Sequence, residues 1–498
     1  MSDEATHRVV VIGAGFSGIG AAVRLLQSGE DDVVILERAE RLGGTWRDNV
    51  YPGCRCDVPS HLYSFSFALN PDWHHTYADQ AEIWAYLEET AERFGVIPHI
   101  RFSHRVEEAS WDDERGEWLL TTSHGTVRAR YLIGAAGSLA EPALPPIPGL
   151  AQFEGALMHS ARWDRSHTFS GQRVAVIGTG ASAIQIVPSI QPEVAQLTVF
   201  QRTPGWVLPH PVRDVRPWER RLFRRFPLAQ RLLRALIYWQ REVVIVSAFT
   251  KYDGLRLLLE RGVRRHLARQ VIDPDLRARL TPRHEMGCKR VLPSNDFYPA
   301  LTKDNAELVT GSIARIEPEG ILTTDGRLHL FDVIVCATGF HVSDNPMSNR
   351  IVGRGGRRLA EAFTAGLPSY LGTTFPHFPN FFMLTGPNTG TGHTSQVFMV
   401  ECQLRYVLDA LDFLGPGDDV VAEVLGPVAQ SFSDQVQRKL QRTVWASGCA
   451  SWYQNEAGRN VAMWPDYTTA YRRQTKRFDP GDYLISTLSA RTGAASAP

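Results

Sequence analysis

Two glycine-rich turns each follow a short apolar run, and the first lies near the amino terminus. Residues 8–12, RVVVI, predict a buried parallel strand, GAGFSG follows directly, and the next residues have the period of a helix. In this order Gly13 permits a tight turn, Gly15 lets the backbone approach a pyrophosphate, and Gly18 lets helix and strand pack closely. A second strand, VVILE, ends in Glu37, whose carboxylate can accept hydrogen bonds from both hydroxyls of a ribose. We therefore expect a dinucleotide site for an adenosine ribose without a phosphate.

The second turn repeats this arrangement with one difference in charge. In RVAVIGTGASAIQIV the fingerprint positions are held by Gly178, Gly180 and Ala183, and the strand LTVFQR follows. Arg202 lies at the position that Glu37 holds in the first unit, and its guanidinium can pair with a ribose 2′-phosphate. The sequence therefore predicts a second dinucleotide site that selects NADPH over NADH.

These turns need two α/β units to position them. The proline-rich stretch EPALPPIPG, residues 141–149, predicts an extended crossover out of the first unit. The buried-strand pattern FDVIVCATGF, residues 331–340, predicts the return. The expected fold is α/β, with two Rossmann-like dinucleotide-binding domains, the second inserted in the first.

Residues 213–283 differ from the rest because they have helical period and are rich in arginine, with aromatic residues interleaved. We interpret them as a helical insertion whose arginine face is solvated. The alternative is a patch that binds a membrane surface or nucleic acid. The final stretch, residues 486–498, predicts a disordered tail.

Composition limits the class of protein. The chain has 498 residues, 43% hydrophobic and 21% charged, and 53 Lys and Arg residues balance 53 Asp and Glu residues. We expect a globular protein of two or three domains with no global field that favours nucleic acid. The polar start MSDEATHR is unlike a secretory signal, and the apolar runs are far shorter than the ~20 residues that span a bilayer. These features predict a cytoplasmic protein without an integral membrane segment.

The cysteines are scattered and follow no metal-ligand or C-x-x-C spacing. They are Cys54, Cys56, Cys288, Cys336, Cys402 and Cys449. Without an export signal a disulfide framework is not expected, so we predict free thiols and no metal site. Cys54 and Cys56 are interpreted as ordinary loop residues.

The segment FEGALMHSARWD, which follows the linker, carries the most specific motif. Its pattern is Phe153, Gly155, His159 and Trp163. It resembles the F-x-G-x-x-x-H-x-x-x-W fingerprint of type I Baeyer–Villiger monooxygenases, with Asp164 where proline is often found. Related flavin-containing and N-hydroxylating monooxygenases usually have Phe or Tyr in place of the tryptophan. Taken alone, the histidine and tryptophan would be a linker and a packing residue, and we assign them to domain coupling rather than to chemistry.

The resemblance covers nearly the whole chain and implies where the cofactors lie. GGTWRDNVYPGCRCD, residues 43–57, is similar to the segment that lines the flavin in that family, which places FAD beside it. Lys289 and Arg290 in GCKRVLP are implied to reach the nicotinamide cofactor, and Trp452 in GCASWYQN to close over bound NADP. The alternative for Trp46 and Trp452 is a role as core aromatics.

A set of residues is predicted to form the site. The cofactor-binding residues are Gly13, Gly15, Ser17, Gly18, Glu37, Arg38, Gly44, Thr45, Trp46, Asp57, Tyr63, Val106, Gly178, Thr179, Gly180, Ala181, Ser182, Ala183, Arg202, Thr203, Lys289, Arg290 and Trp452. Of these, Arg290 and Asp57 are also predicted to be catalytic.

The chemistry that the resemblance implies is insertion of one oxygen atom of O2 beside a ketone carbonyl through a C4a-peroxyflavin, giving an ester or lactone. A fixed guanidinium near the peroxide would stabilise negative charge there, and we assign that role to Arg290, held by Asp57. The alternative for this pair is a structural salt bridge. Loss of the peroxide to solvent protons would waste NADPH, so retained NADP is expected to act as a lid.

Other flavoprotein activities remain as alternatives. One is a monooxygenase that oxygenates sulfur or nitrogen, and another is an NADPH-oxidising flavoprotein that does not oxygenate. A disulfide reductase is disfavoured because no C-x4-C follows the first turn. The resemblance leaves open which ketone is used and how many chains assemble, although residues 378–398 are expected near the flavin.

With the cofactors assigned, the expected domains follow the chain. They are the FAD domain, first part, 1–140; the linker with the fingerprint, 141–170; the NADP domain, 171–212 and 284–330; the helical insertion, 213–283; the FAD domain, second part, with the substrate and lid region, 331–485; and the tail, 486–498.

Overall fold

The apolar run after the amino terminus forms the central strand of the first lobe, in a computed structural model that describes residues 6–487 except 251, 343, 365, 418–419 and 450. This strand, β1 (Thr6–Ile12), pairs in parallel with β2 and β6. Val9, Val10 and Val11 are all fully buried, as expected for a strand covered on both faces. Helix α1 (Phe16–Gln27) follows the glycine turn and packs on the sheet and against α11 (Gln396–Leu414).

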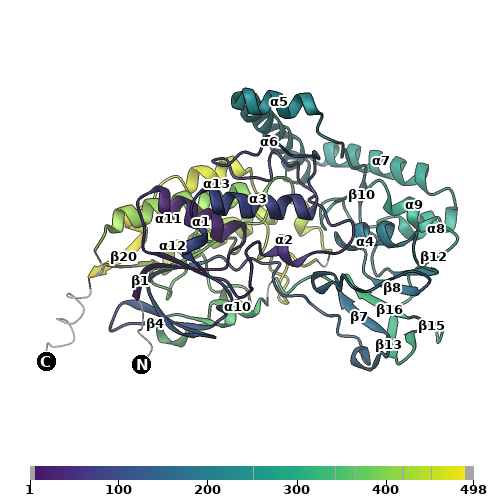
Figure 1. Cartoon of the computed structure of the whole chain (residues 1–498), viewed down its shortest axis with the longest axis horizontal. Helices are drawn as coiled ribbons and strands as arrows, with labels where there is room; N and C mark the ends of the chain where they lie inside the picture. Colours follow the sequence, from purple (N-terminus) through teal and green to yellow (C-terminus); the bar gives the residue numbers. More distant parts are fainter. Residues whose placement is uncertain are drawn as a thin grey trace.

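The first sheet contains eight strands in the described part of the chain, in the order β17-β4-β5-β6-β1-β2-β3, with β18 beside β6. Their bounds beyond β1 are β2 (Val33–Leu36), β3 (Ile100–Arg101), β4 (Val106–Asp112), β5 (Glu117–Thr122), β6 (Gly125–Gly134), β17 (Ile351–Val352) and β18 (Phe381–Met383). The last two follow the whole second lobe in the chain. The second unit is therefore inserted in the first, and Figure 1 shows the two lobes side by side.

The second sheet is parallel and has the order β12-β9-β8-β16-β7. Its strands are β7 (Ala156–His159), β8 (Arg173–Ile177), β9 (Gln196–Phe200), β12 (Ala306–Val309) and β16 (Val333–Cys336). The predicted return segment thus supplies β16, which pairs with β7 and β8 in this sheet. The chain goes back to the first sheet only after β16.

The two crossovers between the lobes run beside each other. Residues 141–149 have no helix, as the prolines predict, and Pro142 bridges to Phe340. The Ala143 N–H donates to Gly339 O at 2.9 Å, and the His341 N–H donates to Glu141 O at 2.9 Å. The outgoing and returning segments therefore form one two-stranded connection.

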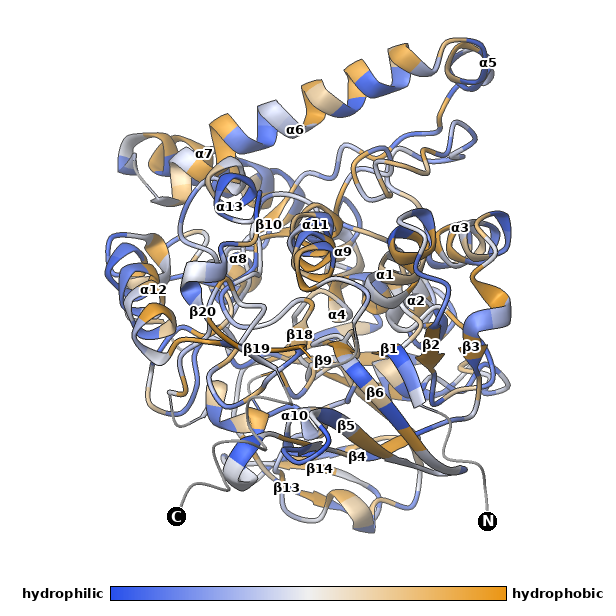
Figure 2. Ribbon diagram, turned by 90° about the vertical axis from the view of Figure 1, so that its left-hand side faces the viewer, coloured by the Kyte–Doolittle hydropathy of each residue, from blue (hydrophilic) through white to orange (hydrophobic). Residues whose placement is uncertain are grey.

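The helical insertion is confirmed as helical, and one of its helices stands out along the top of the molecule (Figure 2). It comprises α5 (Pro217–Arg225), α6 (Pro227–Thr250), α7 (Asp253–Gln270) and α8 (Pro274–Leu280). The exposed surface of the insertion carries more than the expected solvated arginine face. Leu228, Leu232 and Leu236 of α6 are also exposed, whereas an amphipathic helix of a globular protein turns such residues inward.

Smaller elements complete the two lobes. The helices are α2 (Thr45–Asp48), α3 (Gln80–Arg93), α4 (Ala183–Ile190), α9 (Phe297–Leu301), α10 (Pro346–Asn349), α12 (Gly426–Leu440) and α13 (Thr468–Gln474). The strands are β10 (Val207–Leu208), β11 (Leu292–Pro293), β13 (Ile313–Glu317), β14 (Gly320–Thr323), β15 (Leu328–Leu330), β19 (Val420–Val424) and β20 (Tyr483–Thr487). Of the predicted tail, residues 486–487 belong to β20, which contradicts disorder there, and residues 488–498 lie outside the described part. Among the described residues no helix combines the length and apolar character needed to cross a bilayer.

Candidate active site

A cavity of about 2010 Å³ reaches the carboxyl ends of strands in both sheets. Its lining includes the turns after β1 and β8 and the residues that follow β2, β9 and β16. Cofactors of open α/β sheets bind at this edge. One cavity thus serves both predicted nucleotide sites.

The first glycine turn has the backbone that its sequence predicts. Gly13 has a φ of +102°, in the region that favours glycine. A Cβ on Gly18 would lie 1.8 Å from Gly13 O, so close packing of helix on turn requires this glycine. Gly18 is therefore a packing residue and does not line the cavity, whereas Gly13 and Gly15 do.

Glu37 lies at the end of β2 and is held in place from two sides. Its carboxylate is buried, accepts from the Ala14 N–H at 2.8 Å, and pairs with Arg47 Nη1 at 2.8 Å. The Ala39 N–H donates to the same Oε1 as Arg47, at 3.0 Å. The carboxylate is thus fixed in the cavity wall before any ribose arrives.

The segment after the first helix supplies aromatic side chains to the same cavity. Trp46 Nε1–H donates to the Tyr63 hydroxyl at 3.0 Å, and the two rings meet edge to face. Trp46 and Tyr63 both line the cavity, although Trp46 is also part of the core. Trp46 is therefore both a core aromatic residue and part of the cavity wall, and its contact with FAD stays a prediction.

The second glycine turn is built in the same way. Gly178 has a φ of +116°, and a Cβ there would lie 2.5 Å from Ala337 O. Ala183 is buried at the start of α4 and does not line the cavity. Arg202 is exposed to the cavity, and its charge together with burial lowers the pKa of Lys289, burial being the larger cause. Two cations are therefore near each other in the cavity, and binding of a 2′-phosphate there stays a prediction.

Arg290 and Asp57 form an ion pair across the two lobes. Arg290 Nε and Nη2 both donate to Asp57 Oδ2, at 2.8 Å and 2.5 Å. This carboxylate raises the pKa of Arg290 above its usual range, so the guanidinium is charged. Both side chains line the cavity, and the arginine side chain remains 38% exposed. The predicted pairing is confirmed; its catalytic role stays a prediction.

Tyr453 is a residue that the sequence analysis missed. It is buried, lines the cavity, and has its pKa raised to about 12, mainly by burial. The charges of Arg290 and Asp57 act on its hydroxyl in opposite directions. Trp452 beside it is 45% exposed and packs edge to face on the tyrosine ring. The motif GCASWYQN contains both residues, so the signal was present but only one was chosen.

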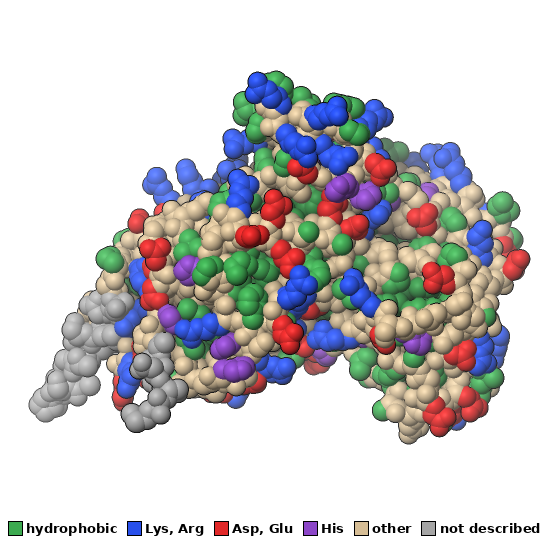
Figure 3. Space-filling model, in the orientation of Figure 1, with side chains coloured by type: hydrophobic (Ala, Val, Ile, Leu, Met, Phe, Trp, Pro, Cys, Tyr) green, Lys and Arg blue, Asp and Glu red, His purple; other side chains and the backbone are tan. Residues whose placement is uncertain are grey.

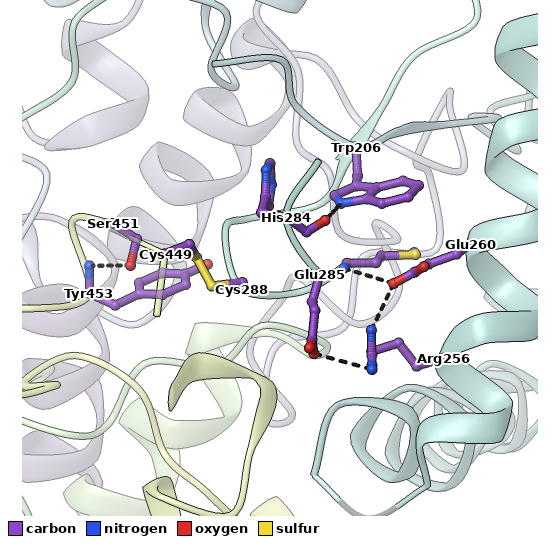
Figure 4. The surroundings of a disulfide bond; sticks show 10 residues. Trp206, Arg256, Glu260, His284, Glu285, Cys288, Cys449, Ser451 and Tyr453 are labelled. Carbon is purple, nitrogen blue, oxygen red and sulfur yellow. Dashed lines mark hydrogen bonds and ion pairs between the residues drawn. A yellow bond between two sulfur atoms is a disulfide. The ribbon is translucent and has the colours of Figure 1, made fainter. Parts of the chain in front are cut away.

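The prediction that all six cysteines are free is wrong for two of them. Cys288 and Cys449 form a disulfide, shown in Figure 4. Cys288 directly precedes Lys289 and Arg290, and Cys449 lies just before Trp452 in the chain. The bond therefore ties the loop that carries the cavity cations to the segment that carries Trp452. The remaining cysteines, Cys54, Cys56, Cys336 and Cys402, are free and buried, and burial raises the pKa of the Cys54 thiol to about 12.

A second contact between the lobes was also missed. The Tyr51 hydroxyl donates to Gln185 Oε1 at 3.0 Å, and Gln185 Nε2–H donates to Arg55 O at 2.9 Å. Tyr51 and Arg55 belong to the flavin-lining segment, whereas Gln185 lies on α4 of the second unit. This contact joins the segment expected at one cofactor to the helix expected at the other.

The family fingerprint lies beside the crossovers between the lobes. His159 ends β7, and its ring packs edge to face on Phe340 of the returning crossover. Burial lowers the pKa of His159 to about 4, so it is neutral. Trp163 stacks on Phe169 and lines the cavity. These contacts fit the assignment to domain coupling.

The remaining predicted residues also lie along the cavity. They are Ser17, Arg38, Gly44, Thr45, Val106, Thr179, Gly180, Ala181, Ser182 and Thr203. Residues 378–398, which were expected near the flavin, contribute Met383, Thr385, Gly386, Thr389, Gly390, Thr391, Thr394, Gln396 and Val397. In the described residues no cluster of three or more His, Cys, Asp or Glu side chains is arranged to hold a metal.

Known proteins resemble the chain throughout its length. Residues 6–282 match the family described as flavin-binding monooxygenase-like. A Baeyer–Villiger monooxygenase of Streptomyces coelicolor is 46% identical over 98% of this chain and 95% of its own. One of Pseudomonas aeruginosa is 44% identical over 96% of this chain and 92% of its own.

Solved structures share the fold as well as part of the sequence. A crystal structure of OTEMO with FAD and NADP superposes with a TM-score of 0.87 at 27% identity and covers 96% of this chain and 99% of that one. The closed structure of cyclohexanone monooxygenase gives a TM-score of 0.84 at 28% identity, covering 97% and 99%. The expected fold class and family are confirmed. With the fingerprint, the paired nucleotide turns and relatives of this identity, the chain belongs to the flavin-binding monooxygenase family, among its Baeyer–Villiger members.

Proposed function

We propose that this protein uses FAD, NADPH and O2 to convert a ketone into an ester or lactone. The observation that carries the proposal is the Arg290–Asp57 pair, which lies in one cavity with both nucleotide-binding turns. Relatives named Baeyer–Villiger monooxygenases support the reaction class. Because NADPH is regenerated inside cells, the proposal also includes a cytoplasmic location.

The residues at the first turn fit FAD. The backbone after β1 is open for a pyrophosphate because Gly13 and Gly15 present no side chain to the cavity. Glu37 offers a fixed acceptor for ribose hydroxyls, and the cation beside it, Arg47, is already paired with this carboxylate. Trp46 and Tyr63 extend the wall toward the Arg290–Asp57 pair, where we place the isoalloxazine ring.

The residues at the second turn fit NADPH. Arg202 and Lys289 are close enough for one charge to lower the pKa of the other, and bound phosphate would relieve this repulsion. Thr203 accepts a hydrogen bond through its backbone oxygen from the Thr179 hydroxyl at 3.2 Å, which fixes the loop next to the arginine. An NADH ribose would leave both cations without an anion.

Arg290 provides positive charge beside the reaction. Reduced FAD, once bound, supplies the electrons that activate O2. Arg290 Nε and Nη2 both donate to Asp57. Its Nη1 makes no hydrogen bond to another described residue. That nitrogen can donate to the oxygen that becomes negative as the ketone carbonyl is attacked. Asp57 is a positioning residue, since it holds the guanidinium and so sets the direction of this donor.

Trp452 and Tyr453 lie where water must be excluded. Tyr453 is already buried, whereas Trp452 is half exposed and can cover the nicotinamide end of the cavity by a local movement. Exclusion of water prevents loss of the activated oxygen as hydrogen peroxide. We assign both residues to the cover over bound NADP that was expected of Trp452 alone.

The proposal is tested by anaerobic reduction with NADPH, followed by ¹⁸O2 and a panel of ketones with mass spectrometry of the products. We expect an ester or lactone that carries one ¹⁸O. An apolar sulfide is included because oxygenation of sulfur alone would assign the chain to the heteroatom alternative. NADPH oxidation that yields only hydrogen peroxide with every ketone would contradict the proposal.

A further inference from the structure

Helix α6 has its apolar stripe turned away from the protein. Leu228, Leu232, Leu236, Trp239 and Val243 follow one another at spacings of four, four, three and four residues, which places them on one helix face. The three leucines are 66–71% exposed. Figure 2 shows this helix standing clear along the edge of the molecule, and at 1.5 Å per residue it is roughly 36 Å long.

The opposite face of the same helix is turned toward the protein, with polar contacts at Gln230, Arg234 and Glu242 and apolar side chains buried in its second half. Gln230 is 2% exposed and its Nε2–H donates to Asn70 O at 2.5 Å. Arg234 Nη1–H donates to His61 O at 2.8 Å, and Glu242 pairs with His393 at 3.0 Å. The orientation of the first half of α6 is thus fixed by buried polar contacts, and its leucines face outward, the inverse of an ordinary surface helix. An apolar stripe held outward in this way calls for a partner.

The charges next to the stripe restrict the partner. The exposed charged side chains of α5 and α6 are all arginine, namely Arg221, Arg224, Arg225 and Arg231. The two acids of these helices, Glu219 and Glu242, are buried and paired with Arg213 and His393. Arg224 is partly neutralised by Asp72 at 2.7 Å. The rest give a local positive charge on a chain whose net charge is zero.

Aromatic side chains flank the stripe. Trp218 belongs to α5, Phe226 lies between α5 and α6, Trp239 lies within the stripe, and Tyr252 follows α6. All four side chains are 53–61% exposed. Tryptophan and tyrosine are favoured where an apolar phase meets water. Figure 3 shows cationic and hydrophobic side chains together over α5 and α6.

We propose that the outer face of α5 and α6 docks on an anionic lipid surface, with the leucine stripe in the acyl boundary and the arginines at the headgroups. This combination of an apolar face and flanking cations is that of helices that lie in the membrane interface. A second copy of this chain, packed face to face, would bury the leucines but leave the arginines without an anion. Nucleic acid would satisfy the arginines but leave the leucines in water.

Vesicle co-sedimentation of the full-length protein tests the proposal. The vesicles are phosphatidylglycerol with phosphatidylcholine in equal parts, or phosphatidylcholine alone. We expect binding to the anionic vesicles, at least tenfold weaker binding to the neutral ones, and weakening with added salt. No binding to the anionic vesicles would overturn the proposal.

Variants separate the apolar and the cationic contributions. Leu232→Glu with Leu236→Glu should weaken vesicle binding at least tenfold. The matched control is Phe413→Glu with Leu484→Glu, which makes the same change in charge at two side chains that are each 53% exposed elsewhere. Arg221→Glu with Arg225→Glu should also weaken binding tenfold or more. Equal weakening by the control pair would overturn the proposal, because it would trace binding to net charge alone.

Sedimentation velocity identifies the competing partner. If the unmutated protein self-associates without lipid and the leucine variant does not, the face is a contact between copies and the lipid proposal fails. If salt-sensitive binding survives the leucine variant, the face binds polyanions and the proposal also fails. Vesicle binding needs no turnover, so either result leaves the proposed oxygenation untouched.

Discussion

The two nucleotide-binding turns share a backbone and differ in how their selecting charge is held. Glu37 is buried and fixed by the Ala14 N–H and Arg47. Arg202 is exposed, and the nearby Lys289 repels it. The carboxylate of the predicted FAD site is thus held in place by the protein, whereas a phosphate at the predicted NADPH site would relieve repulsion. This difference suits a cofactor that stays bound and a cosubstrate that exchanges in each cycle.

The largest effect is expected at Arg290, whose pair with Asp57 joins the two lobes. Arg290→Ala should keep bound FAD and some oxidation of NADPH, yet lower ester formation about 100-fold or more, because a fixed charge at the reacting oxygen is lost. The electrons should appear as hydrogen peroxide, which a peroxidase-coupled assay measures beside the ester yield. Arg290→Lys is the control that keeps a charge without the two-pronged contact to Asp57. An Arg290→Ala enzyme with the ester rate of the unmutated protein would remove Arg290 from the mechanism.

A second expected effect concerns the first nucleotide turn, where the Glu37 carboxylate is held in place. Glu37→Ala leaves the Ala14 N–H without its buried acceptor and removes the ribose contact, so FAD binding should weaken roughly 100-fold. Absorbance of FAD per protein after gel filtration measures this. Glu40→Ala, at an exposed position three residues on, serves as the control. Unchanged FAD content in the Glu37 variant would show that the carboxylate does not hold the ribose.

A smaller effect is expected at the second nucleotide turn, where Arg202 and Lys289 repel each other. Arg202→Ala removes one of two phosphate contacts, which should cost about 1.5–3 kcal/mol in NADPH binding and little in NADH binding. The ratio of KM values for the two cofactors reads this out. The unmutated protein should prefer NADPH, and equal use of both would contradict the assignment. Lys289→Ala should give a similar shift, and the double variant less than their sum because the mutual repulsion is gone.

The smallest effect concerns acid stability at the crossovers between the two regions. Burial lowers the pKa of His159 to about 4 from an ordinary value of 6.5. As pH falls below about 6.5, His159 takes up a proton in the unfolded chain but not in the folded protein. The free energy of unfolding therefore falls until about pH 4. The slope is at most about 1.4 kcal/mol per pH unit for one such histidine. His159→Gln should flatten this loss in denaturant titrations between pH 6.5 and 4, whereas His124→Gln, at an exposed position, should not.

Local backbone chemistry explains which parts were predictable. Gly13, Gly178 and Glu37 lie in short stretches where strand, turn and helix follow one another, so the sequence alone indicates their positions. The Arg290–Asp57 pair was predicted only through the family resemblance, because 233 residues separate its members. The Cys288–Cys449 bond and the outward face of α6 were not predicted. Both depend on which distant segment packs against them. The spacing of the leucines indicates one helix face but does not indicate that this face is turned outward.

The disulfide has a consequence for how the protein would extend under force. Its two cysteines are separated by 161 positions in the sequence. That stretch includes β16, the returning crossover and the strands that complete the first sheet. A pull applied at the two termini would pass through the sulfur atoms and leave this stretch unstretched. At about 3.4 Å per residue, roughly 550 Å of contour length is withheld until the bond is reduced.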